Sequence, residues 1–144
     1  MLKIIVLVVS AFLFGCAHQG IETVPVELFK GVAIEFPASN LSHVDALDIG
    51  FYSENKYLGY VQKEFLPKEE QPAVDFIRIA LELTKKKKWK IKEVSRDHLV
   101  GYVVYLEGTS TMHLASTLDK ETVLTISTSD EKVEEILSTL KTIQ

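Results

Sequence analysis

Apolar and polar residues alternate with period two in residues 31–36. The apolar side chains there are Val32, Ile34 and Phe36, and Pro37 follows. Such alternation is typical of a strand with one buried face, and proline ends the strand because it has no amide donor. The sequence therefore predicts a strand over residues 31–36 and a turn over residues 38–43.

A second alternating stretch predicts a β-hairpin over residues 47–61. Its arms are joined by the polar turn 53–56, and it ends before Pro67. Asp45 and Asp48 lie on or beside the first arm. Because they are three residues apart, a regular strand points them to opposite faces, which favours solvated charges over a carboxylate pair.

The spacing changes to that of a helix after Pro72. The apolar positions of this segment are Ala73, Phe76, Ile77, Ala80, Leu81 and Leu83. Glu69 and Glu70 precede the segment and lysines follow it. This order of charges complements the helix dipole, so a helix is predicted from residue 73 to the lysine run.

Four further strands are predicted between Trp89 and Ser127. The stretch 99–106 is apolar on both faces apart from Gly101, which predicts a strand in the middle of the sheet with both faces covered. Turn residues separate this stretch from its neighbours. The segment is therefore predicted to be an antiparallel meander.

The C-terminal segment predicts a second helix over residues 130–142. Thr128 and Glu131 have the spacing of a capping box, in which each side chain satisfies a free backbone donor of the helix start, and Ser129 is a competing cap. The apolar positions Val133, Ile136, Leu137 and Leu140 share one face. Together these elements predict a single α+β domain over residues 31–144, with an antiparallel sheet of about six strands flanked by helices.

The first sixteen residues carry a different pattern. Lys3 precedes eleven uncharged, largely apolar residues, 4–14, and Gly15 and Cys16 follow. A helix of that length reaches roughly 16 Å, well short of the hydrocarbon core of about 30 Å. The pattern predicts an export signal that is removed rather than a membrane span.

The tetrapeptide Leu13-Phe14-Gly15-Cys16 resembles the lipobox of bacterial lipoproteins. The resemblance implies that Cys16 carries covalent lipid, that cleavage falls between Gly15 and Cys16, and that residues 1–15 are the signal peptide. Residues 16–30 would then be the lipidated N-terminus and tether. Ala17 is similar to the residue of lipoproteins sorted to the outer membrane, where the domain would face the periplasm. The alternative is an ordinary signal peptide with an incidental cysteine.

Composition narrows the possible partners. Loss of residues 1–15 removes one lysine and no acidic residue, so the net charge falls from −4 to −5. An acidic chain in the envelope does not favour a nucleic-acid partner. Cys16 is the only cysteine, so no intrachain disulfide forms and a core of ordinary size must stabilise the domain.

The order of strand, hairpin, helix, meander and capped helix is similar to the PsbP-like fold, an α/β/α sandwich. That fold is shared by photosystem extrinsic subunits, a nuclear GTPase-binding protein and many bacterial envelope lipoproteins. The likeness covers residues 31–144 and is most specific at residues 122–127 and the helix after them. It implies a binding platform without catalysis, and it carries over no functional residue.

Motifs of catalysis and of metal binding are not found. The sequence holds no Gly-x-Ser-x-Gly elbow and no phosphate-binding glycine loop. The histidines His18, His43, His98 and His113 lack the spacing of a zinc site, so neither a metal nor a cofactor beyond the lipid on Cys16 is predicted. His113 is expected to be a satisfied or exposed imidazole.

One stretch has two interpretations. Lys85, Lys86, Lys87 and Lys88 precede Trp89. These residues suit contact with anionic lipid or with a polyanionic envelope polymer. The simpler interpretation is that the lysines end a helix and that the indole enters the core of the next strand.

These patterns predict a membrane-anchored envelope lipoprotein whose domain binds a protein or polymer of the envelope without catalysis. One alternative is an envelope hydrolase or small-ligand carrier with a pocket between sheet and helices. Another is an immunity or inhibitor lipoprotein. The sequence does not indicate an oligomeric state.

Overall fold

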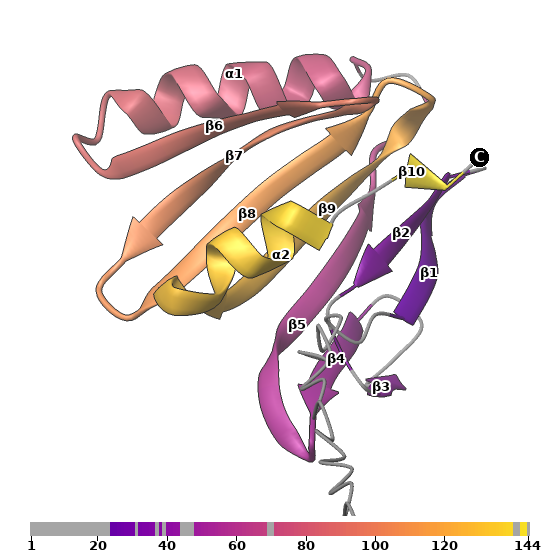
Figure 1. Ribbon diagram of the computed structural model, residues 1–144. Helices are drawn as coiled ribbons and strands as arrows, with labels where there is room; N and C mark the ends of the chain where they lie inside the picture. The colour runs from indigo at the N-terminus through magenta and orange to yellow at the C-terminus, as the bar shows by residue number, and fades with distance from the viewer. Residues whose placement is uncertain are drawn as a thin grey trace, which may run out of the picture.

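The computed structural model of the protein describes residues 24–30, 32–36, 38, 40–43, 48–68, 71–139 and 142–143. These residues form two helices, one 3₁₀ turn and the strands of two sheets (Figure 1). The elements are β1 (Val24–Phe29), β2 (Val32–Phe36), β3 (Asn40–His43), β4 (Asp48–Ser53), β5 (Lys56–Phe65), α1 (Ala73–Lys85), β6 (Lys90–Arg96), β7 (Leu99–Leu106), β8 (Thr109–Ser116), β9 (Asp119–Ser129), η1 (Asp130–Lys132), α2 (Val133–Thr139) and β10 (Thr142–Ile143).

The main sheet has seven antiparallel strands in the order β3-β4-β5-β9-β8-β7-β6. The predicted α+β class and the antiparallel sheet between helices are therefore confirmed, with the short β3 as an added edge strand. The predicted hairpin is β4 and β5, and the predicted meander is β6 to β9. The strand 99–106, however, is β7 and lies second from one edge, whereas β9 occupies the middle.

A second, small sheet is formed by β1, β2 and β10 in the order β1-β2-β10. β2 confirms the strand predicted from residue 31. β1 lies within the segment predicted as the tether, and its Leu28 and Phe29 are fully buried. The folded domain therefore extends at least to Val24 on the N-terminal side, and residues 16–23 lie outside the described residues.

Two apolar cores cover opposite faces of the main sheet. α1 packs on β7, β8 and β9, and its buried face is made by Ala73, Ile77 and Leu81, as the spacing predicts. On the other face, α2 and the small sheet share a core with Phe51 and Met112. Figure 1 shows α1 and α2 on opposite sides of the ribbon formed by β6 to β9. The domain thus has three layers.

The predicted capping box is wrong. The Thr128 hydroxyl donates to the Leu58 carbonyl at 2.7 Å, and the residue that caps η1 is Ser129, without a side-chain hydrogen bond. Thr128 instead holds β9 to β5. The segment starts as the 3₁₀ turn η1 and becomes the seven-residue helix α2, whose Val133 and Ile136 are buried as expected. The prediction of a helix up to residue 142 is wrong, because α2 ends at Thr139 and Thr142 belongs to β10.

Candidate binding surfaces

The predicted lipidation site lies outside the part of the chain that the structure describes. This applies to Cys16, to Gly15 before it and to the whole of residues 1–15. The anchor therefore stays a prediction from sequence. No helix within the described ranges is both long and apolar enough to cross a membrane.

Lys85 is the first residue of the predicted basic patch, and its ammonium group forms ion pairs with two carboxylates. Its Nζ lies 2.8 Å from Glu82 Oε1 and 2.8 Å from Glu93 Oε1. The hydrogen bond to Glu82 and then that to Glu93 raise the pKa of Lys85. Lys85 thus links α1 to β6 and is not available to an anionic partner.

The next four residues, Lys86, Lys87, Lys88 and Trp89, form a tight turn between α1 and β6, which we call the basic turn. The Lys87 amide donates to the Thr84 carbonyl at 2.9 Å, and Lys88 takes a left-handed conformation with φ of 60°. Among the described residues, none forms an ion pair with the three lysines of this turn.

Trp89 is 45% exposed, and β6 starts only at Lys90. The interpretation of Trp89 as a core residue of the next strand is therefore wrong. Lys87 Nζ lies 4.7 Å from the centroid of the indole, within the range of a cation–π contact. The basic turn thus presents an indole and three ammonium groups together at the end of a rigid helix.

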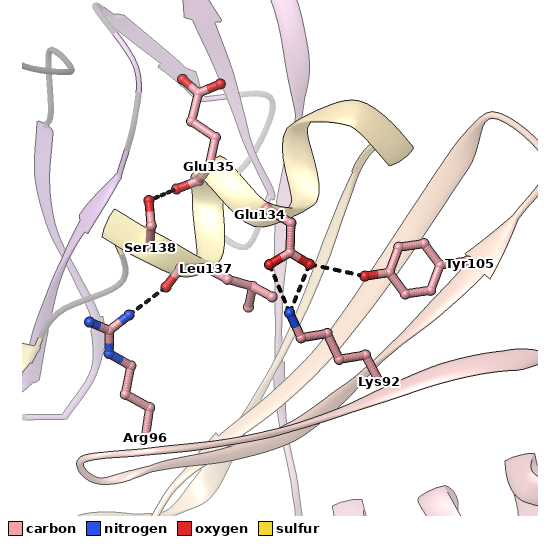
Figure 2. Close-up of polar contacts among 7 residues, drawn as sticks. All are labelled: Lys92, Arg96, Tyr105, Glu134, Glu135, Leu137 and Ser138. Carbon is pink, nitrogen blue, oxygen red and sulfur yellow. Dashed lines mark hydrogen bonds and ion pairs between the residues drawn. The ribbon is translucent and has the colours of Figure 1, made fainter.

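A second surface lies between β6 and α2, where a cleft of about 290 Å³ is lined by both elements. Figure 2 shows Lys92 reaching from β6 to Glu134, with Nζ 2.7 Å from both carboxylate oxygens. The Tyr105 hydroxyl donates to the same carboxylate at 3.4 Å, and Arg96 donates to the Leu137 carbonyl at 2.8 Å. These bonds hold α2 against the edge of the sheet.

The charges of this cleft satisfy one another. The hydrogen bond from Lys92 is the main cause of the lowered pKa of Glu134. An ion pair between exposed side chains adds little stability. We therefore interpret the contacts in Figure 2 as a clamp that orients α2.

A third surface is aromatic and rich in hydroxyls, and we call it the tyrosine face. Its residues are Tyr52, Tyr57 and Tyr60 of the β4–β5 hairpin, Thr111 and His113 of β8, and Thr125 and Ser127 of β9. The register explains their common side. Ser127 lies opposite both Tyr60 and Thr111, and His113 lies opposite Thr125. Alternation along each strand then sends the intervening apolar residues to the opposite core.

The phenols are the most exposed part of the tyrosine face. Tyr57 is 54% exposed and Tyr60 is 38% exposed. The Tyr52 and Tyr57 rings meet edge to face with centroids 5.4 Å apart. Burial, and after it the phenols of Tyr52 and Tyr60, raise the pKa of Tyr57, so this ring is neutral at pH 7.

The hydroxyls and the imidazole of the tyrosine face contact one another across β8 and β9. Thr111 Oγ1 lies 3.4 Å from Ser127 Oγ, and Thr125 Oγ1 lies 3.3 Å from His113 Nδ1. Burial lowers the pKa of His113, so its ring is neutral at pH 7. This agrees with the expectation of a satisfied imidazole.

A cleft of about 310 Å³ adjoins this face, at the end of the sheet where β5 and β9 separate. It is lined by Lys56, Tyr57, Leu58, Gly59, Tyr60, Gly108, Thr109, Ser127, Thr128, Ser129, Glu131 and Lys132. Lys132 forms an ion pair with Glu135. The cleft therefore combines two exposed phenols with several hydroxyls and with the charged residues Lys56, Glu131 and Lys132.

A fourth feature is the buried carboxylate of Asp119, at the start of β9. It accepts hydrogen bonds from the Lys30 amide at 2.7 Å, from the Thr122 hydroxyl at 2.8 Å, and from the Glu121 and Thr122 amides at 3.0 and 3.1 Å. Burial alone raises the pKa of this carboxyl, but the four hydrogen bonds outweigh burial and leave the pKa below its usual value. Asp119 thus ties the turn after β1 to the main sheet.

Metal ligands do not converge anywhere in the described ranges, where no group of three or more His, Cys, Asp or Glu side chains is found. His98 lies in the turn before β7, with Nδ1 3.3 Å from the Thr117 hydroxyl. This contact is one between an imidazole and a hydroxyl, not an arrangement of metal ligands. The imidazoles of both His98 and His113 therefore face hydroxyls.

No family model matches the chain, and no curated protein matches it.

The tyrosine face was not predicted from the sequence, although the sequence holds a signal for it. In β8 the residues Thr109, Thr111 and His113 alternate with Ser110, Met112 and Leu114, and the second set is buried. β9 repeats this alternation. Over residues 109–113 of β8 and 125–129 of β9, the outward residues are hydroxyls or imidazole, which indicates an open polar part of the sheet rather than a part covered by a helix.

Proposed function

We propose that the protein is a lipid-anchored protein of the bacterial envelope whose single domain binds its partner without catalysis. The observation that carries this proposal is residues 13–16, which resemble a lipobox and follow an export signal too short to span a bilayer. The three-layer arrangement supports a PsbP-like sandwich, a fold that serves mostly as a binding platform. We further propose the inner leaflet of the outer membrane as its location.

Within this proposal, the basic turn contacts anionic lipid. Lys86, Lys87 and Lys88 lack ion-pair partners among the described residues, and Trp89 beside them is exposed. Lysines next to an exposed indole are the combination with which peripheral proteins bind an anionic bilayer. A lipid anchor holds the domain near that surface, so even a weak contact orients it.

The binding role is favoured over a ligand carrier or hydrolase. That alternative requires a pocket between sheet and helix. The cleft between β6 and α2 has this position, but Lys92, Glu134 and Arg96 already bind groups of the protein itself there (Figure 2).

The anchor is tested by Cys16→Ser in cells fed labelled palmitate. We expect loss of the label and release of the protein from the membrane fraction, whereas Ala17→Ser, a control at the next position, keeps the label. Label that persists in Cys16→Ser would show that the interpretation of residues 13–16 is incorrect.

The basic turn is tested by vesicle binding of an unlipidated chain that begins at residue 17. Each lysine near an anionic surface contributes about 1 kcal/mol, so replacing Lys86, Lys87 and Lys88 by Gln weakens partitioning roughly 150-fold. Lys85→Gln is the matched control, because Lys85 is already paired with two carboxylates. The fluorescence of Trp89, the only tryptophan, reports the contact. Equal binding by the triple variant and by Lys85→Gln would refute the proposed contact.

A further inference from the structure

The tyrosine face is the part of the main sheet that neither apolar core covers. On this side α1 packs against Tyr102, Val104, Ala115 and Val123, which form the apolar end of the face. Beyond them, along β8 and β9, the outward residues are polar and half-buried. An aromatic and polar surface is therefore left facing solvent beside α1.

Strand pairing accounts for Tyr52 and Tyr57 but not for Tyr60. Tyr52 and Tyr57 form a cross-strand aromatic pair, which stabilises a hairpin. Tyr60 lies between Gly50 on β4 and Ser127 on β9. Neither neighbour is aromatic, and the glycine puts no side chain beside the ring. Tyr60 thus remains 38% exposed without a structural reason for a phenol there.

The groups around Tyr60 have the chemistry that recognises a sugar. A pyranose ring has a weakly apolar C–H face and a rim of hydroxyls. The C–H face stacks on an aromatic ring, and the hydroxyls bond to donors and acceptors such as Thr111, Thr125, Ser127 and His113. Hydroxyl groups both donate and accept, so the contacts at 3.3 and 3.4 Å across β8 and β9 are easily exchanged for contacts with a ligand.

The tyrosine face differs from the basic turn in its charge. The seven residues of the tyrosine face carry no formal charge when His113 is neutral. An anionic headgroup or an acidic polymer finds no counter-charge on these residues. A neutral polar chain loses little by leaving water there, because the hydroxyls replace its hydrogen bonds.

We propose that the tyrosine face binds a neutral saccharide chain, with one sugar ring stacked on Tyr60 and the end of the chain in the adjoining cleft. The cleft of about 310 Å³ lies at the small end of ligand sites, which suits one or two sugar units. In the envelope such a chain comes either from the cell-wall glycan or from a sugar carried on a lipid or protein. This inference goes beyond the proposed function and does not depend on the basic turn.

The test is isothermal titration calorimetry of the full chain purified in detergent. The probes are N-acetylchitotetraose, which has the acetamido sugar of cell-wall glycan, and maltotetraose, which lacks it. We expect at least one of them to bind, and Tyr60→Ala to weaken that binding about tenfold, the effect of one lost aromatic stack. Tyr60→Phe keeps the ring and is expected to bind within about threefold of the natural protein.

Trp89→Ala is the matched control, since it removes an equally exposed aromatic side chain from the basic turn. It is expected to lower vesicle binding, measured by co-sedimentation because the variant has no tryptophan, and to leave saccharide binding unchanged, so failure of the two proposals can be distinguished. Binding of N-acetylchitotetraose and co-sedimentation with purified cell-wall sacculi identify the wall as the source. Binding of maltotetraose alone identifies another neutral glycan, and both results support the site.

Three results overturn the proposal. The first is the absence of heat for both tetrasaccharides. The second is equal affinity of Tyr60→Ala and the natural protein. The third is an effect of Tyr60→Ala on vesicle binding alone, which would make the face a membrane contact. Should Tyr60→Ala fail to fold, amide chemical-shift changes at Thr111, Thr125 and Ser127 during titration of the natural protein decide the matter, and their absence counts against the site.

Discussion

Asp119 offers the most direct test of how the small sheet is held to the main sheet. Its Oδ2 accepts hydrogen bonds from the Lys30 amide and the Thr122 hydroxyl, and its Oδ1 accepts those from the Glu121 and Thr122 amides. In Asp119→Asn an NH₂ group replaces one carboxylate oxygen. This group is a donor, and the N–H and O–H groups around it are donors too, so it cannot bond to them. The variant thus loses one or two of these bonds.

Each hydrogen bond to a charged group contributes about 1.5–3 kcal/mol. Because the bonds from Lys30 and Glu121 are only partly buried, we expect Asp119→Asn to lower the free energy of unfolding by about 2–3 kcal/mol at pH 7. Glu121→Gln is the control. This variant removes the same charge, but from an exposed side chain two residues after Asp119. Its effect on the free energy of unfolding therefore stays within about 0.5 kcal/mol.

The pH dependence gives an independent check of the cause. The pKa of Asp119 lies lower in the folded than in the unfolded protein. The stability that the carboxylate contributes is therefore complete above its unfolded pKa of about 3.9 and is lost as pH falls through the folded pKa. The difference between the natural protein and Asp119→Asn should shrink below about pH 4.

Urea unfolding followed by far-ultraviolet circular dichroism between pH 2.5 and 7 measures both effects. Hydrogen exchange of the Lys30 amide reports the local bond, and it should speed up in Asp119→Asn. A loss below 0.5 kcal/mol at pH 7, or a difference that is the same at pH 2.5 and pH 7, would refute the assigned role.

Two further predictions concern β7 and β8. A Cβ at Gly101 would lie 2.1 Å from the His113 carbonyl oxygen, so Gly101→Ala should lower the free energy of unfolding in urea by about 2–3 kcal/mol. At Gly108 only the φ of +83° opposes a side chain, so Gly108→Ala should lower it by about 1 kcal/mol. Reversal of that order would contradict the close approach of β7 and β8. Burial lowers the pKa of His113, so the folded state disfavours its proton; the free energy of unfolding should fall as pH drops below about 6.5 and level off below the folded pKa. His113→Gln should flatten this change, and an unchanged pH profile in that variant would show that burial of His113 is not the cause.

The elements with long, regular patterns were predictable from sequence because burial itself produces the pattern. The period-two alternation of β8 and the helical spacing of α1 record which side chains face a core. β1 was assigned to the tether because residues 17–30 as a whole show little periodicity, although Val24, Val26 and Leu28 alternate with Pro25 and Glu27. β3 was predicted as a turn, since its four residues contain little apolar pattern.

Contacts between distant residues were not predictable in this way. Thr128 and Glu131 have the spacing of a capping box, but the carbonyl of Leu58 competes for the Thr128 hydroxyl, and Leu58 lies seventy positions earlier in the chain. The exposure of Trp89 likewise depends on β6 beginning one residue later than its apolar character suggests. Local patterns also carry no information about strand order.

The central place of β9 in the main sheet determines when the domain can fold. β9 pairs with β5 on one side and with β8 on the other, and its pairs include Gly59 with Thr128. Among the described strands it is the only link between the β3-β4-β5 half and the β6-β7-β8 half. A nascent chain that has emerged only to residue 118 therefore holds two unconnected antiparallel segments. Such non-local pairing makes folding slow. The two halves of the main sheet therefore cannot join until β9 has been synthesised.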